Sequence, residues 1–456
     1  MLSKSLPVLL LLILALALTG CPAPKESGPP PTAGTPPVAP AQAGGKTTLN
    51  LWTIWNTEPR QGALAEIIKA FEAANPDITI LTQAQEPDAY KTNIRVALGG
   101  NQPPDIFFVW SGEKMLHNFV RGGNVADLTA DLDANNKEWR GKLVAPSLAS
   151  YTYDGKTYGV PYLLQCTFLL YNKKMFADKG WAVPQTWDEL VTLCEKIKPT
   201  GITPLALGNA KKWPASHFPC VLVQRMIGKA AAERQYDPLG PGSYSEPAWI
   251  KSLEMFKQLV DTGAFSKSPN GVERDMARTL FYSGKAAMFY TGTWDFARFS
   301  KGGEAPQSFW DAWDFVNFPK VTGGKGEQEC LAGSADGYVV SSKSANREAA
   351  VKFLKFMTSP EQAQQFAQVC QELVQVQGAV TDQNAGPRLR KYRDTVQKAT
   401  SLSAWTDTMM EESVAQAYMT GVQGLVEGTL KPQQVMDAVI KRQREVKADL
   451  AAKGAK

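Results

Sequence analysis

Thr48-Leu-Asn-Leu-Trp52 and Asp105-Ile-Phe-Phe-Val-Trp110 bound the stretch of sequence that decides the fold. The first run alternates and predicts a strand, and the second is apolar throughout, as a strand buried on both faces should be. Between them the sequence predicts a helix over 63–74, a strand over 78–81 and a helix over 90–98. This β-α-β-α-β order is typical of a parallel sheet with helices on both faces.

The residues that follow the predicted strands are the first place to look for a site. Ligands of parallel α/β sheets lie outside the carboxyl ends of the strands. Trp55 and Asn56 follow the first strand, and Trp110 to Glu113 end the third. The whole chain has 12 tryptophans and 13 tyrosines. Aromatic faces of this kind suit a flat, partly apolar ligand such as a sugar ring.

Later segments continue the alternation of strands and helices. Tyr153-Asp-Gly-Lys156 predicts a hairpin turn, and Thr186 with Glu189 forms the sequence pattern of a helix capping box. Residues 281–290 are expected to lead into a strand that ends at Thr291-Gly292-Thr293-Trp294. With 456 residues the chain is too long for one hydrophobic core, so we expect two domains.

The first 46 residues indicate export. Lys4 and an apolar run that ends at Leu18 have the organisation of a signal peptide over 1–20. Leu18-Thr19-Gly20-Cys21 resembles a bacterial lipobox, which predicts a lipid on Cys21; the rival interpretation is an ordinary signal peptide with a chance cysteine. Residues 21–46 are rich in proline and predict a tether. We therefore expect an extracytoplasmic protein, in the periplasm or at the cell surface, anchored to a bacterial membrane.

Composition argues against several classes of protein. The formal net charge is +5, and no basic stripe indicates a nucleic-acid partner. The chain has two histidines, His117 and His217, and neither belongs to a cluster of histidines and cysteines that would supply a full ligand set, so we predict no metal site and no cofactor. Five cysteines remain after Cys21, and their pairing is left open; they are Cys166, Cys194, Cys220, Cys330 and Cys370.

A series of motifs along the chain carries a resemblance to a known family. The motifs are Leu51-Trp52-x-x-Trp55, Phe71-x-x-x-Asn75-Pro76-Asp77-Ile78, Gly99-x-x-x-Pro103-Pro104-Asp105-Ile106, Asp154-Gly155-Lys156-x-Tyr158-Gly159-Val160-Pro161, Leu170-Tyr171-Asn172-Lys173, Pro184-x-Thr186-Trp187-Asp188-Glu189-Leu190, Ser283-Gly284-Lys285-Ala286-Ala287-Met288, Gly292-x-Trp294 and Ala349-Ala350-x-x-Phe353-Leu354-x-Phe356. In this order the chain resembles solute-binding protein family 1, the maltose-binding-like proteins of ABC importers. The resemblance covers residues from about 48 to 440.

The resemblance implies an α/β, two-lobed, periplasmic-binding-protein-like fold of type II, whose hinged lobes have parallel-type sheets flanked by helices. It places lobe 1 at 47–160 and 293–358 and lobe 2 at 161–292 and 359–456. It also implies a carbohydrate ligand, an ABC permease as partner and no catalytic activity, and we expect a monomer.

Carried over residue by residue, the resemblance implies a set of ligand-binding positions. Trp110, Trp294 and Trp405 match places where the family stacks aromatic rings on sugar faces. The other expected ligand-binding residues are Asn56, Glu113, Gln165, Trp213, Asp295 and Asp407. The maltose-binding pattern has an Asp-Lys pair where this chain has Asn56-Thr57, so the specificity of that relative does not transfer.

Each of these residues also has a structural interpretation. Core packing is the rival for Trp110, which ends a buried strand, and a surface position is the rival for Glu113 and Asp295. Trp52, Trp187 and Trp249 are predicted to be core residues.

The leading hypothesis is a lipid-anchored receptor that brings a mono- or oligosaccharide to an ABC permease. One alternative is a secreted glycoside hydrolase or lyase, in which Glu113 and Asp295 would form the required carboxylate pair. Another is the same fold with a non-sugar ligand. A phosphate ester would require arginines in the cleft and a polyamine would require carboxylates, and the sequence indicates neither cluster.

Overall fold

The computed structural model describes residues 46–237 and 240–452. The predicted signal peptide, Cys21 and the tether up to residue 45 lie outside the described residues. In the part of the chain that is described, no helix combines the length and the apolar character needed to cross a bilayer.

The predicted β-α-β-α-β unit is confirmed at the start of the described chain. Its elements are β1 (Thr47–Thr53), α1 (Arg60–Ala74), β2 (Ile78–Ala84), α2 (Pro87–Gly99) and β3 (Ile106–Trp110). β1 pairs in parallel with both β2 and β3. One face of α1 is apolar because Leu64, Ile67 and Phe71 recur at helical spacing, and these three side chains are buried.

Short elements complete this half of the molecule. They are η1 (Glu113–His117), α3 (Asn118–Arg121), α4 (Thr129–Lys142), α5 (Ala145–Ala149), β4 (Thr152–Tyr153) and β5 (Lys156–Thr157). β4 and β5 form the predicted hairpin. Its turn residues Asp154 and Gly155 both have positive φ, which a two-residue hairpin turn requires.

Two long strands join this half to the rest of the chain. β6 (Val160–Asn172) and β10 (Leu331–Val340) are antiparallel neighbours in the middle of the sheet. Among the described residues the main sheet has nine strands, with the path β2-β1-β3-β10-β6-β8-β7, while β11 and β9 pair with β10 and β6. β10 is antiparallel to β3 as well, so an antiparallel pair of strands adjoins the parallel unit formed by β1, β2 and β3.

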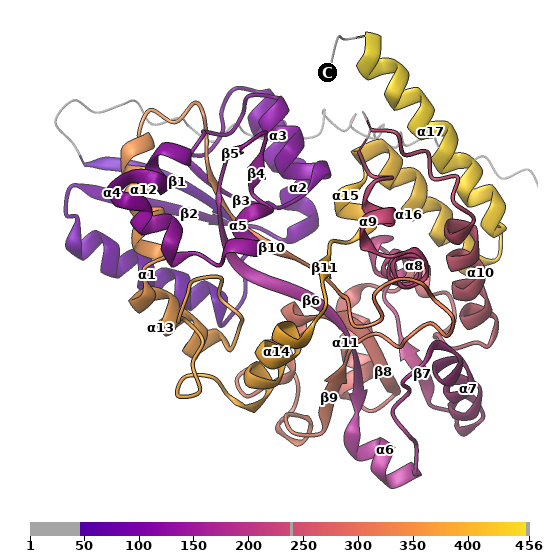
Figure 1. Cartoon of the computed structure of the whole chain (residues 1–456). Helices are drawn as coiled ribbons and strands as arrows, with labels where there is room; N and C mark the ends of the chain where they lie inside the picture. The colour runs from indigo at the N-terminus through magenta and orange to yellow at the C-terminus, as the bar shows by residue number, and fades with distance from the viewer. Residues whose placement is uncertain (1–45, 238–239, 453–456) are drawn as a thin grey trace, which may run out of the picture. The chain divides into compact units, whose positions relative to one another are not determined.

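Helices dominate the second half of the chain (Figure 1). Its elements up to the central strand are α6 (Lys173–Lys179), α7 (Trp187–Ile197), η2 (Lys198–Thr200), β7 (Thr203–Ala206), α8 (Trp213–Ile227), α9 (Lys229–Glu233), α10 (Pro247–Asp261), η3 (Pro269–Gly271), α11 (Arg274–Tyr282), β8 (Ala286–Gly292), η4 (Thr293–Asp295), η5 (Ala297–Phe299), η6 (Gln307–Phe309) and β9 (Trp313–Val316). The strand predicted to end at Trp294 stops at Gly292, because the chain turns there into η4.

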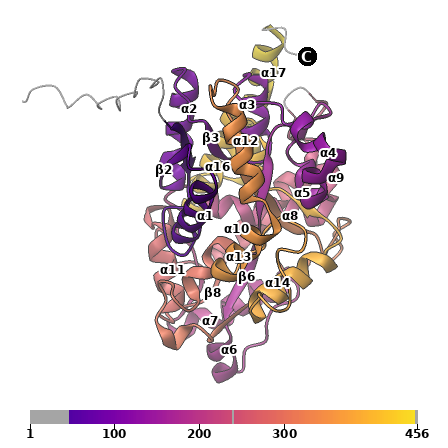
Figure 2. The ribbon, with the colours of Figure 1, turned by 90° about the vertical axis from the view of Figure 1, so that its left-hand side faces the viewer.

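The chain after β10 folds back over both halves. Its elements are α12 (Arg347–Met357), α13 (Pro360–Cys370), α14 (Pro387–Lys398), β11 (Leu402–Ser403), α15 (Thr406–Met409), α16 (Glu412–Glu427) and α17 (Pro432–Ala452). α1, α12 and α13 contact one another and lie together on the side shown in Figure 2. α13 begins at Pro360 and α17 at Pro432, because the first turn of a helix tolerates proline.

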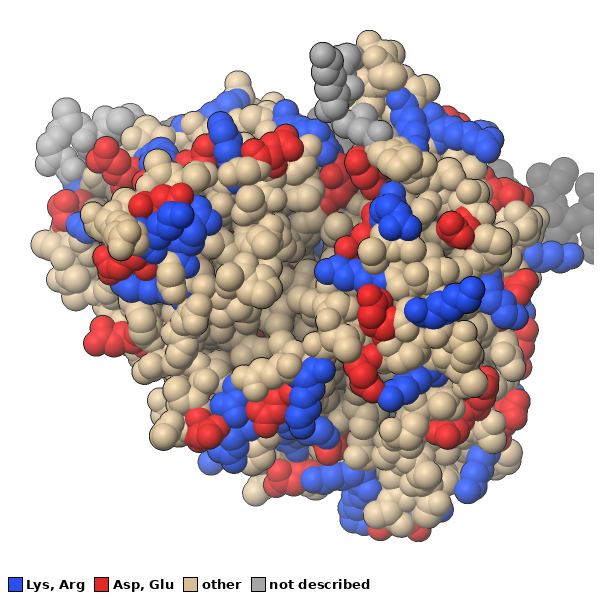
Figure 3. Space-filling model, viewed as in Figure 1, with Lys and Arg blue, Asp and Glu red and all other residues tan. Residues whose placement is uncertain are grey.

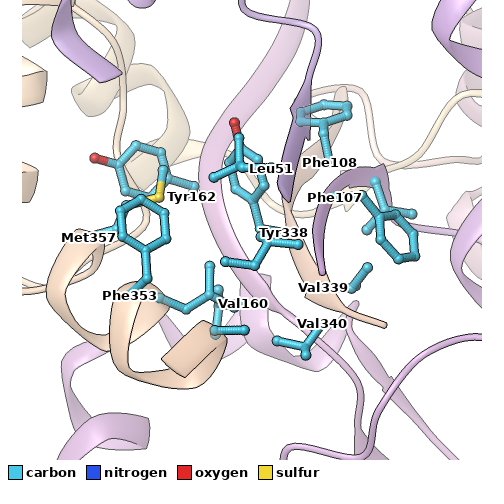
Figure 4. Close-up of a cluster of buried hydrophobic side chains, with 14 of the residues drawn as sticks. Leu51, Phe107, Phe108, Val160, Tyr162, Tyr338, Val339, Val340, Phe353 and Met357 are labelled. Carbon is cyan, nitrogen blue, oxygen red and sulfur yellow. The ribbon is translucent and has the colours of Figure 1, made fainter. Parts of the chain in front are cut away.

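Three clusters of buried side chains form the core. The first covers the β1–β3 side, and part of it is drawn in Figure 4, where side chains of β3, β6, β10 and α12 meet. The second surrounds α8, α10 and α16, and the third lies between β6, β8 and α14. β6 and β10 contribute side chains to all three clusters, so they connect the two halves.

The packing of two segments differs from the expected division into lobes. Residues 293–330 were expected in lobe 1, but Phe299 and Trp313 pack in the third cluster. Residues 359–456 were expected in lobe 2, but Phe366 of α13 packs in the first cluster. The division into two lobes stays a prediction, and the packing favours other bounds for these two segments.

The five cysteines of the described chain are all unpaired and buried. Burial raises the pKa of the thiols, to about 12 for Cys166 and Cys220.

Candidate functional site

A cavity of about 630 Å³ lies between side chains of the first and second clusters. A second cavity of about 310 Å³ continues it, because the two share Asp88, Lys91, Lys114, Lys211, Trp213 and Asp407. Volumes of this size are usual for sites that hold small organic ligands. The two cavities together form one elongated candidate site.

The first wall of the cavity comes from the carboxyl ends of β1 and β3. Trp55 and Asn56 line it after β1, and Trp110 lines it at the end of β3. The ring of Trp110 packs edge-on against Phe108, with 4.7 Å between centroids, and is half-buried. The Lys91 amino group lies 5.1 Å from the Trp110 ring centroid. The Trp110 ring, which packs against Phe108, therefore lines this wall at the carboxyl end of a strand, where the sequence predicts ligand contacts.

The opposite wall is a cluster of three tryptophans from separate parts of the chain. Trp294 of η4 packs edge-on against Trp213 of α8 at 5.8 Å and against Trp405 at 5.6 Å. Trp405 is almost fully buried and its ring stacks on His217, with 5.4 Å between centroids and 10° between planes. The indole N–H of Trp294 is buried without an acceptor among the described residues.

Six of the nine predicted site residues line this cavity. They are Asn56, Trp110, Trp213, Trp294, Trp405 and Asp407. Asp407 Oδ1 lies 3.1 Å from His217 Nε2. Burial raises the pKa of Asp407, but the hydrogen bond with His217 and the charge of Lys114 outweigh burial, and the net pKa is lowered.

Three predicted polar residues do not line the cavity. Glu113 is buried in an ion pair with Arg121 and lies 3.4 Å from His117 Nδ1. Gln165 is buried in β6 and accepts a hydrogen bond from Thr293 Oγ1 at 2.8 Å. Asp295 is fully buried behind Trp294, because the turn of η4 sends consecutive side chains in different directions. The pair Glu113 and Asp295, suggested for a glycosidase, therefore does not line this cavity.

Asp295 is the common ion-pair partner of three arginines that the sequence did not predict to cluster. Its Oδ1 lies 2.9 Å from Arg278 Nε, 3.4 Å from Arg274 Nη2 and 3.9 Å from Arg298 Nε. Burial raises the pKa of Asp295, but the charges of Arg278 and Arg274 outweigh burial and lower it overall. All three arginines line the cavity. The sequence signal was the spacing of Arg274 and Arg278, which places both on one face of α11.

A fourth arginine and an unpaired carboxyl complete this end of the cavity. Arg60 Nε donates to Glu372 Oε1 at 2.7 Å, while Arg60 Nη2 is buried without a partner among the described residues. Asp336 lies at a register shift between β10 and β6, where a bulge redirects the side chain. Burial raises the pKa of Asp336 to about 8, and its Oδ1 also has no described partner. The expectation that the cleft has no cluster of arginines is therefore wrong.

Among the described residues, no group of three or more histidine, cysteine, aspartate and glutamate side chains is placed to hold a metal ion.

Comparisons with known proteins show the family and the fold of the chain. The family model named bacterial extracellular solute-binding protein matches residues 55–364. The chain is similar to the multiple sugar-binding protein of Streptococcus mutans, with 27% identity over 331 residues that cover 71% of this chain and 74% of that protein.

Two solved structures show the same fold. One comes from a study of xylan utilization by the thermophilic bacterium Caldanaerobius polysaccharolyticus; it has a TM-score of 0.80 at 27% identity and covers 87% of this chain and 99% of that one. The other is a maltose/maltodextrin-binding domain from Bdellovibrio bacteriovorus bound to maltotriose. Its TM-score is 0.70 at 22% identity, with 88% of this chain and 99% of that one covered.

Proposed function

The chain belongs to the family of bacterial extracellular solute-binding proteins, and from that premise we propose that it captures a mono- or oligosaccharide for an ABC importer. The predicted α/β fold of the type II periplasmic-binding-protein kind is confirmed. Similarity to a multiple sugar-binding protein supports the carbohydrate as ligand.

The observation that carries this proposal is the pair of tryptophan walls. Trp110 on one side and Trp213, Trp294 and Trp405 on the other line the same cavity. Apolar ring faces of a saccharide stack on indole rings, while its hydroxyl groups need polar partners. Asn56 and Asp407 line the cavity and would supply such partners here.

Binding is proposed to work by closure of two lobes over the ligand. A ligand that contacts both walls stabilises the closed form because the open form offers it only one wall. β6 and β10, which run through all three core clusters, are the segments about which the lobes would rotate.

The anchoring of the protein is part of the same proposal. Lipid on Cys21 and the tether over 21–46 would hold a monomeric receptor outside the cytoplasm, beside the permease that takes its ligand.

The surface charge does not favour a nucleic-acid partner. Acidic and basic side chains are interspersed on the face shown in Figure 3, and no large patch of one sign is seen there.

Thermal unfolding of the full chain in the presence of mono-, di- and trisaccharides tests the proposal. A ligand that binds only the native state raises the unfolding temperature in proportion to ln(1 + [L]/Kd). We expect one saccharide family to raise it and a polyamine to leave it unchanged. A shift with the polyamine and with no saccharide would overturn the carbohydrate assignment.

We further propose that the protein has no catalytic activity. Incubation with oligosaccharides, followed by an assay for new reducing ends, checks this. New reducing ends that appear at a rate proportional to protein concentration would contradict it.

A further inference from the structure

The charged groups of the cavity are balanced at one end and unbalanced at the other. At the balanced end Asp88 pairs with Lys91, with 2.8 Å between Oδ1 and Nζ, and Asp407 interacts with the charge of Lys114 beside His217. On the rim Lys211 lies 3.6 Å from Glu273. None of these groups leaves a charge of one sign uncompensated.

At the other end four arginines converge. Arg60, Arg274, Arg278 and Arg298 all line the cavity. The buried carboxyl groups described at this end are those of Asp295, Glu372 and Asp336. Burial raises the pKa of Asp336 to about 8, so near pH 7 mainly Asp295 and Glu372 contribute negative charge. The two further acidic partners are Asp275 and Glu304, whose side chains are 86% and 42% exposed, so water screens their charges. This end therefore carries an excess of positive charge.

At this end of the cavity, the described protein groups do not accept from every N–H donor of the guanidinium groups. Arg60 uses Nε for Glu372, and its buried Nη2 has no described partner. Arg274 shares a single Asp295 oxygen with Arg278. A guanidinium offers five donors in a fixed fork that matches the two oxygens of a carboxylate or phosphate. Both side chains line the cavity, and the described protein groups do not use all of their donors.

The positive charges of these arginines repel one another, which helps to lower the pKa of two of them. Burial and the charges of Arg278 and Arg274 lower the pKa of Arg298 to about 10. Burial also lowers the pKa of Arg274, and the charge of Arg278 adds to that effect against the pull of Asp295. An anion at this position would relieve the repulsion.

The positive end adjoins the tryptophan wall. The guanidinium carbon of Arg274 lies 4.8 Å from the ring centroid of Trp213 and 5.9 Å from that of Trp294. A ring stacked on Trp294 would therefore present its substituents to Arg274.

From these contacts we infer that the ligand is an acidic saccharide, whose sugar ring lies on the tryptophan wall and whose anionic substituent is bound by Arg60, Arg274 and Arg298. The inference rests on the proposed function and specifies its substrate class. The anionic group is a carboxylate, as in a uronic acid, or a phosphate ester, and both have oxygens that fit the same guanidinium forks.

Isothermal titration of the full chain, purified in detergent, with matched pairs of ligands tests the inference. The pairs are galactose with galacturonate and glucose with glucuronate, together with their short oligomers; glucose 6-phosphate supplies the phosphate arm. We expect the acidic member of a pair to bind at least tenfold more tightly than the neutral member. The tighter of the uronate and phosphate arms identifies the anion. The preference should shrink in about 1 M salt, where the Debye length is about 3 Å.

Variants connect the preference to the arginines. Arg274→Gln and Arg298→Gln should abolish most of the tenfold preference for the acidic over the neutral member of a pair, and both proteins should stay folded because Asp295 keeps Arg278 as partner. Arg388→Gln is the matched control, because the Arg388 guanidinium lies 4.2 Å from the Trp313 ring centroid and does not line the cavity.

Each other outcome overturns the inference in a different way. Equal or tighter binding of the neutral members overturns it and leaves the proposed saccharide function intact. Absence of binding by every saccharide overturns both. Binding of acetate or inorganic phosphate alone as tightly as the acidic saccharide overturns it as well, because the ring would then contribute nothing.

Discussion

Trp294 is the residue at which the apolar and the charged parts of the cavity meet, since its ring contacts Trp213, Trp405 and the guanidinium of Arg274. We predict that Trp294→Ala weakens saccharide binding at least tenfold, which is about 1.4 kcal/mol, without unfolding the protein. Titration calorimetry measures the affinity and circular dichroism the fold.

Trp310→Ala is the control for that variant. Trp310 is also half-buried, but its indole N–H donates to the Ala305 carbonyl and it lies outside the cavity. Unchanged affinity in a folded Trp294→Ala protein would remove this tryptophan from the binding site.

Asp336 gives the pH dependence of stability a predictable sign. Burial raises the pKa of its carboxyl in the folded protein to about 8, above the ordinary value of about 3.9. Between these two values the folded state holds a proton that the unfolded state has lost, so this group lowers stability as pH rises. We predict that Asp336→Asn removes this decline, which has a limiting slope of about 1.4 kcal/mol per pH unit for one proton.

Urea unfolding of the wild type and of Asp336→Asn at several pH values from 5 to about 8 measures this effect. As the pH rises toward 8, the free energy of unfolding of the variant should increase relative to that of the wild type. Parallel pH profiles of the two proteins would contradict the assignment.

Single residues also show which parts of the site the sequence could predict. Trp110 and Trp294 were predictable because an aromatic side chain directly after a strand lies at the ligand-binding edge of the sheet. Asp295 and Glu113 were not, because their orientation depends on distant partners such as Arg278 and Arg121. The arginines were missed because arginine is usually a surface residue and only the fold reveals that four of them converge.

At the scale of elements, local sequence signals predicted most boundaries. The capping box of α7 is an example: Thr186 Oγ1 accepts from the Glu189 N–H at 3.3 Å, and the Glu189 side chain accepts from the Thr186 N–H. The place of β10 between β3 and β6 was not predictable, because β10 and β3 are more than 200 residues apart and no local signal fixes their pairing.

The same cap supports a stability prediction. Thr186→Ala should lower the free energy of unfolding by about 1 kcal/mol, because one N–H of the first helical turn loses its acceptor. Thr186→Ser keeps a hydroxyl and should change stability much less. Urea unfolding compares the two, and equal losses in both would show that the methyl group rather than the cap matters.

The ion pairs between η4 and α11 share one buried carboxylate, that of Asp295. Asp295→Asn would leave Arg278 and Arg274 without their common counter-charge, and breaking a buried ion pair in this way costs about 3 kcal/mol or more. Asp275→Asn removes an exposed partner of Arg278 and should cost less than about 1 kcal/mol. Equal costs in urea unfolding would mean that burial does not strengthen the Asp295 pairing.

At the scale of the whole molecule, Gly112, which precedes η1 on one wall of the cavity, lies against α15 of the other wall. Gly112 has φ of 109°, and a Cβ there would lie 2.8 Å from Met409 Sδ and 3.0 Å from the Thr408 carbonyl oxygen. Gly112 is close in sequence to Lys114 and Met115 on one wall, and Thr408 and Met409 follow Asp407 on the other wall. The two walls of the cavity are therefore in contact at this point. A side chain at position 112 would push the walls apart.

We therefore predict that Gly112→Ala weakens saccharide binding as well as stability. The strained backbone alone should cost of order 1–3 kcal/mol in the free energy of unfolding. Gly123→Ala separates strain from spacing, because Gly123 also has positive φ, of 65°, but its Cβ would meet nothing within 4 Å. Calorimetry should find weaker binding only in Gly112→Ala, while urea unfolding should find both variants destabilised. If both variants kept wild-type affinity, the spacing of the two walls at Gly112 would not control the cavity, and closure over the ligand would have to be set elsewhere, at β6 and β10.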